Sequence, residues 1–194
     1  MKVRKFLFAG ALIVASLFSV NSVMAETTDD VTVNLKFKPV MSIMVNAASD
    51  HKNIDFLFDS QSDYNGGVTV SKKEKHLNVF STGGFQVSLQ TSGKNFTSEN
   101  KNITIPVEDV SVTATPSAGN KLSSYALLGT GLKLSNSSTP FIQSVSGGRS
   151  LDFDVEYKNT GFDPDDYING YNKDFLTEGA TVFTTQLTYT IATN

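Results

Sequence analysis

The chain has 194 residues, of which 39% are hydrophobic and 18% are charged, with 16 Lys and Arg against 19 Asp and Glu. This is the composition of a globular protein, and the lack of a basic excess argues against a nucleic-acid-binding protein. Cysteine is absent and only 2 histidines are present. These counts exclude disulfides, thiolate metal sites and cysteine nucleophiles, and they leave little for histidine-based catalysis. The sequence therefore predicts a non-enzymatic protein without a cofactor.

The first 25 residues have the pattern of a secretory signal peptide. Three basic residues among the first five precede an almost unbroken apolar run over 6–18, and Val23-Met24-Ala25 suits cleavage before Glu26. An apolar run of this length is too short for a membrane-spanning helix, which takes roughly 20 residues. We expect residues 1–25 to be removed on export. Residues 26–194 are then located in the periplasm, at the cell surface or outside the cell, with no transmembrane segment.

Most of the remaining chain shows the period-two alternation of β-strands that bury one face. The two clearest alternations run over 31–37 and 151–157. Further strands are predicted at 40–45, 54–58, 68–70, 77–79, 85–89, 103–107, 110–114, 141–145 and 181–192. Gly-rich segments predict a turn at 63–67 and a bend at Gly83-Gly84, and 159–178 is predicted as a polar loop. Residues 122–134 fit either a short helix or two short strands.

About ten short strands, frequent turns and almost no helical periodicity predict an all-β protein. We expect a single domain over 26–194 that forms an antiparallel, immunoglobulin-like β-sandwich. A closed barrel is the alternative architecture.

Few residues are suited to catalysis. His51 is expected in a polar turn and His76 at the start of a strand, both in solvated settings. Asp152, Asp154 and Glu156 share one strand face and could supply one of the two carboxylates of a glycosidase. A solvated face of an amphipathic strand is the favoured interpretation of these three residues.

The polar loop supplies weak candidates for a calcium site. Asp163, Asp165 and Asp166 carry suitable oxygen ligands, but their spacing does not match a calcium-binding loop. We therefore predict no metal site.

Three tyrosines predicted to lie in loops define an alternative function. Tyr64, Tyr167 and Tyr171 could stack their rings on sugar rings. The chain would then be a secreted glycan- or ligand-binding β-sandwich module, and its partners would be surface glycans.

The two end strands are the strongest candidates for a functional site. Their aligned apolar residues are Val31, Val33, Leu35 and Phe37 in the first strand and Phe183, Leu187, Tyr189 and Ile191 in the last. A strand at the edge of a sandwich presents unpaired backbone groups and can accept a strand from another chain. Alternation does not identify the pairing partner, so both strands could instead pair within their own sandwich.

These end strands resemble those of bacterial chaperone–usher fimbrial subunits. In that family, a C-terminal strand with a preceding Gly, here Gly179, binds a periplasmic chaperone, and an N-terminal strand completes the neighbouring subunit. The resemblance implies an exported structural or adhesive surface protein that assembles by strand exchange with identical or related subunits. Three features differ: the chain has no disulfide, Tyr189 is not the penultimate residue, and the spacing from Gly179 to Tyr189 is short.

Overall fold

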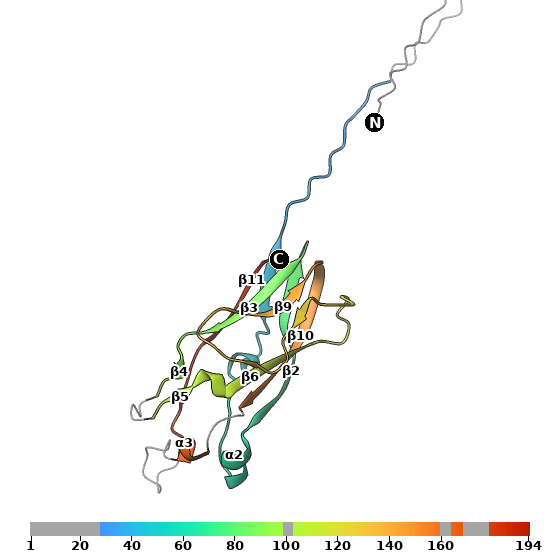
Figure 1. Cartoon of the computed structure of the whole chain (residues 1–194). Coiled ribbons are helices and arrows are strands. Elements are labelled where there is room, and N and C mark those ends of the chain that lie inside the picture. The colour runs from blue at the N-terminus through green and yellow to red at the C-terminus, as the bar shows by residue number, and fades with distance from the viewer. Residues whose placement is uncertain (1–27, 99–102, 160–163, 169–178) are drawn as a thin grey trace, which may run out of the picture. The chain divides into compact units, whose positions relative to one another are not determined.

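The computed structural model describes residues 28–98, 103–159, 164–168 and 179–194 (Figure 1). The chain divides into two units, Met1–Lys36 and Phe37–Asn194. In the first unit, the described residues form neither helix nor strand. The strand predicted over 31–37 is therefore not formed, since a strand needs a neighbour to complete its hydrogen-bond ladder.

The second unit folds into antiparallel sheets. The five-stranded sheet contains, in spatial order, β1 (Met41–Val45), β2 (Thr69–Ser81), β10 (Gly148–Asn159), β6 (Val110–Pro116) and β8 (Leu132–Lys133). The four-stranded sheet contains β11 (Leu187–Thr193), β3 (Phe85–Thr91), β9 (Thr139–Ser144) and β7 (Leu127–Leu128). A third sheet contains β4 (Asn95–Phe96) and β5 (Ile105–Pro106). Every strand pair in the described ranges is antiparallel, so the all-β prediction is confirmed.

Short helical segments connect some of the strands. Within the described residues they are α1 (Ser49–Lys52), α2 (Gln61–Gly66), the 3-10 turn η1 (Val107–Asp109) and α3 (Pro164–Ile168). Helix α2 occupies the predicted turn because Ser60 and Asp63 form a reciprocal capping box. The strand predicted at 54–58 is wrong, since these residues have no regular structure. No helix in the described part of the chain is long and apolar enough to cross a membrane.

Both large sheets contribute to one hydrophobic core. The largest fully buried side chains are Phe85, Phe141 and Phe153, which come from β3, β9 and β10. The alternation that predicted burial over 85–89 is confirmed. Between β9 and β10 the backbone passes so close to β2 that a Cβ at residue 147 would overlap the carbonyl oxygen of Ser81. This close approach explains why that position is glycine.

One charged residue departs from the predicted alternation in β10. The pairing of β10 with β2 shifts register on both sides of Val155, and Asp154 is only 7% exposed at this irregularity. The Asp154 carboxylate accepts hydrogen bonds from the Lys75 backbone N–H (2.9 Å) and the Ser117 hydroxyl, and it pairs with Lys72 (3.1 Å). The expectation that Asp154 is solvated is therefore wrong. Through these three contacts, the Asp154 carboxylate stabilises the irregular region where β10 pairs with β2.

Candidate functional site

The two large sheets leave an open edge formed by β1 and β11. Among the described strands, β1 pairs only with β2 and β11 pairs only with β3. Strands β1 and β11 lie next to each other without forming a ladder. Each of them therefore presents one row of backbone groups without a strand partner.

Half-buried apolar side chains line this open edge. Ile43 and Val45 of β1 and Leu187, Tyr189 and Ile191 of β11 pack against the core, yet none of them is fully buried. On both strands the intervening side chains are exposed. The open edge thus combines unpaired backbone with an apolar stripe, which are the two features that strand addition uses.

Beneath the open edge, four rings form a chain of contacts. Tyr189 and Tyr157 share a hydrogen bond between their hydroxyl groups (2.7 Å), and the Tyr157 hydroxyl also bonds Nε2 of His76 (2.9 Å). On the far side of His76, Nδ1 lies 3.2 Å from Nδ1 of His51. The rings come from β11, β10, β2 and α1. The chain therefore ties the edge strand of one sheet to two strands of the other and to a surface helix.

Burial shifts the titration of the inner rings. It lowers the pKa of His76 to about 4, with smaller contributions from the charges of His51 and Lys73. It raises the pKa of Tyr157 to about 12 and holds that of Tyr189 well above its ordinary value, where the nearby Tyr157 adds to the effect. At neutral pH the three groups are uncharged, and their hydrogen bonds join neutral partners.

We expect the two phenols to make the fold sensitive to alkali. The unfolded chain ionises its tyrosines near pH 10, whereas folded Tyr157 ionises near pH 12, so stability is retained below pH 10 and lost as the pH rises toward 12. The loss from Tyr157 is about 2 kcal/mol at pH 12. Absorbance at 295 nm, followed together with circular dichroism, measures both events. In Tyr157→Phe, one late ionisation should disappear, whereas ionisation of every tyrosine near pH 10 in a folded chain would contradict the expectation.

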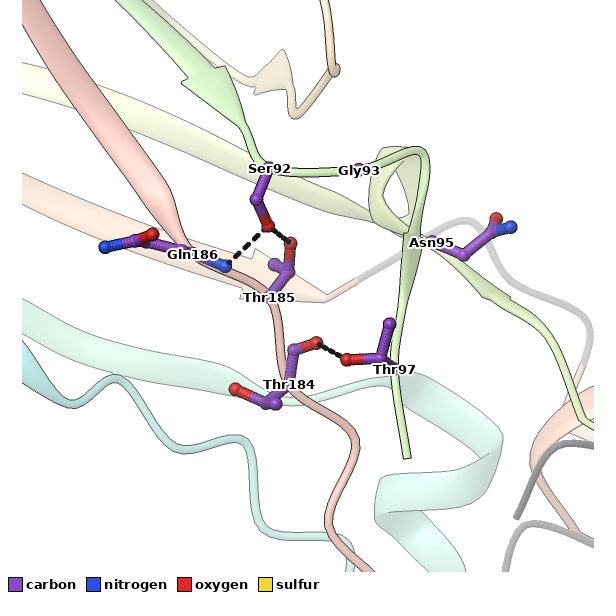
Figure 2. Close-up of a pocket in the computed structure, with 7 residues that line it drawn as sticks. All are labelled: Ser92, Gly93, Asn95, Thr97, Thr184, Thr185 and Gln186. Atoms are coloured by element: carbon purple, nitrogen blue, oxygen red, sulfur yellow. Dashed lines mark hydrogen bonds between the residues drawn. The ribbon is translucent and has the colours of Figure 1, made fainter. Parts of the chain in front are cut away.

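A polar hollow lies where the chain enters β11 (Figure 2). Its lining residues are Ser92, Gly93, Asn95, Thr97, Thr184, Thr185 and Gln186. The Ser92 hydroxyl accepts a hydrogen bond from the Gln186 backbone N–H and lies 3.3 Å from the Thr185 hydroxyl, while Thr97 donates to the Thr184 carbonyl. None of these side chains titrates. These hydrogen bonds anchor the chain at the start of β11.

The two sets of predicted strand residues differ in their burial. Val31, Val33, Leu35 and Phe37 are 80–89% exposed. In contrast, Leu187, Tyr189 and Ile191 lie in β11 and face the core, while Phe183 is half-buried just before the β11 segment. The last strand is therefore formed but begins later than predicted, at Leu187.

The tyrosines proposed for glycan stacking have different surroundings. Tyr167 is buried, and its hydroxyl bonds Asp109 and Asn159. The rings of Tyr64 and Tyr167 both lie against Phe58, with centroids 5.4 and 5.5 Å away. Tyr171 lies outside the described residues. In the described residues, the rings of Tyr64 and Tyr167 therefore pack against Phe58.

Two of the three weak calcium candidates have no described side chain. Asp165 is exposed in α3, and neither Asp163 nor the Asp166 side chain is described. Within the described residues, no three His, Asp or Glu side chains group together in a way that could hold a metal ion.

The histidines are the residues that the sequence analysis misjudged. His76 lies inside β2 and is 1% exposed, so its predicted solvated setting is wrong. His51 is half-buried on α1 and stacks on His76, with ring centroids 5.3 Å apart. The sequence carries no signal for this burial: His76 directly precedes the buried Leu77, so regular alternation predicts an outward side chain.

Comparison with known protein families finds no family model that matches the chain, and comparison with curated proteins finds no relative.

Proposed function

We propose that the chain is an exported, non-enzymatic structural subunit that assembles by intermolecular strand addition. In this proposal, the fold is an immunoglobulin-like sandwich that lacks one edge strand. Residues 31–37 of one copy supply that strand to the open edge between β1 and β11 of another copy. The observation that carries the proposal is the coexistence of an unpaired, alternating apolar segment and an unpaired, apolar edge in one chain.

The two parts match in length and in chemistry. The segment 31–37 has the same number of residues as β11, which is 7 residues long. Its apolar side chains recur at every second position, the spacing needed to fill one face of a sandwich. Each such side chain contributes about 1.5–3 kcal/mol when it is fully buried. The polar residues between them would face solvent.

Local backbone chemistry favours pairing between chains over pairing within one chain. To lie beside β1 of its own chain, the segment would have to reverse direction at Lys38-Pro39. Proline fixes φ near −65° and restricts the preceding residue to extended backbone, whereas tight hairpin turns need positive φ. Val40 is already tied to the residue that follows β2, because its carbonyl accepts from the Thr82 backbone N–H (3.0 Å). A tight reversal is therefore disfavoured, and another copy is the better acceptor.

Deletion of residues 26–38 tests the proposal. A chain that begins at Glu26 should form a ladder of oligomers on native electrophoresis, and the deletion should leave monomers. A synthetic peptide of residues 28–38 should then bind the deleted chain and raise its melting temperature. At 100 times its dissociation constant, the peptide adds about 2.7 kcal/mol of stability.

The control peptide keeps the composition but scrambles the order, which removes the alternation. It should bind at least tenfold more weakly. A chain from Glu26 that stays monomeric, together with a deleted chain that ignores the peptide of residues 28–38, would overturn the proposal. By the family resemblance, a periplasmic chaperone that holds the same edge before assembly is the expected second partner.

A further inference from the structure

The ring of His51 stacks on the ring of His76, which is buried. His76 is 1% exposed, and the His51 ring lies nearly parallel to it, with 19° between the ring planes. His51 belongs to α1, a helix of 4 residues that buries none of its own side chains. A helix with so little buried surface is held mainly by its polar contacts, so it is an element that can part from the sheet at low cost.

The hydrogen bond between the two histidines requires a proton on one Nδ1 atom and none on the other. Their Nδ1 atoms are 3.2 Å apart, so one ring must donate while the other accepts. If both rings are protonated, two N–H groups point at each other and neither finds an acceptor. A positive charge on His76 alone is also unfavourable because the ring lies away from water. Proton uptake therefore works against the closed arrangement.

The charges around His76 come from two elements, α1 and β2. Asp50 on α1 and Lys73 on β2 form an ion pair with a distance of 3.3 Å. The Lys73 charge disfavours a protonated His76 and the Asp50 charge favours it, while the phenols of Tyr157 and Tyr189 are neutral below pH 10. Strands β1, β3 and β9 carry no titratable side chain. His51 and the Asp50–Lys73 pair are thus the charged or titratable groups that can oppose or assist protonation.

We propose that α1 with His51 is an acid-opened cover over His76, closed at neutral pH and released when His76 takes up a proton. Opening gives the His76 imidazolium access to water. It also exposes the inner end of the ring chain that reaches Tyr189 at the open edge. The cover operates within a single chain, so it does not depend on the assembly proposed above.

Because the chain has only 2 histidines, NMR can follow both rings without ambiguity. His76 should titrate near pH 4 rather than near its ordinary pH of 6.5. Amide hydrogen exchange in α1, corrected for the intrinsic effect of pH, should become at least about tenfold faster between pH 7 and pH 4. Neither measurement requires the chain to assemble.

Two variants separate the histidines from the neighbouring ion pair. In His76→Phe, an apolar ring remains under α1, so exchange in α1 should no longer respond to acid. In Asp50→Asn, the ion pair with Lys73 is lost but the histidines remain, so the cover should still be closed at pH 7 and open in acid. Titration of His76 near pH 6.5, unchanged protection of α1 at pH 4, or an Asp50→Asn chain already open at pH 7 would each overturn the proposal. If His76→Phe does not fold, the Asp50→Asn chain and the unmodified chain still decide the question.

Discussion

A single Leu35→Asp substitution is expected to weaken self-association of the chain about 1000-fold. Leu35 is 80% exposed in the single chain, and the proposed assembly buries it in the apolar stripe of another copy. The substitution forfeits about 2 kcal/mol of burial and places a carboxylate in an apolar setting, which costs at least as much again. Sedimentation velocity over a concentration series measures the change. The stability of the monomer should be unaffected because Leu35 supports none of its core.

Asn34→Asp is the matched control for this substitution. It introduces the same charge one residue earlier, on the face of the segment that would point to solvent. Self-association should change less than about threefold, in line with the small effect of an exposed charge. Equal losses in the two variants would show that charge rather than side-chain alternation controls association, and strand addition would then be the wrong mechanism.

Phe153→Ala is expected to destabilise the fold by about 3–5 kcal/mol. Phe153 is fully buried in the core and meets the ring of Tyr125 edge-on, with centroids 5.4 Å apart. Removing the ring leaves a cavity that the strands on either side cannot close. Chemical denaturation monitored by circular dichroism gives the free energy of unfolding directly.

Phe37→Ala makes the same chemical change at a site that is 89% exposed. It should alter the free energy of unfolding by less than about 0.5 kcal/mol. Under the proposed function, Phe37→Ala should also weaken self-association. Phe153→Ala should instead act mainly by lowering the stability of the fold. A Phe37→Ala chain that unfolds as readily as Phe153→Ala would mean that Phe37 belongs to the core, and its role as part of a supplied strand would fail.

Strands with one buried face were predictable because alternation fixes which side chains turn inward. The run over 151–157 was assigned correctly except at Asp154, where a register shift turns a carboxylate inward to three polar partners. A shift of this kind depends on the partner strand, and the sequence of one strand does not contain it. For the same reason, the buried position of His76 was not foreseen.

Pairing between strands was the part that sequence could not supply. The alternation over 31–37 is as clear as that over 151–157, yet the first run forms no strand and the second lies between two neighbours. The capping box of Ser60 and Asp63 shows the opposite situation, since the helix signal was present in the sequence but the glycines that follow it favoured a turn. In the candidate site, the alternating face of β11 was predicted, whereas the ring chain from His51 to Tyr189 depends on which strands meet.

The distance along the chain between paired strands has a consequence for the rate of folding. Leu77 pairs with Phe153 and Leu89 with Tyr189, which are about 75 to 100 residues apart. Such remote pairings close large loops before any contact compensates for the lost chain entropy, so folding in milliseconds to seconds is typical of this topology. During that interval the strands are unpaired and prone to aggregate. Refolding yield should therefore fall steeply as protein concentration rises.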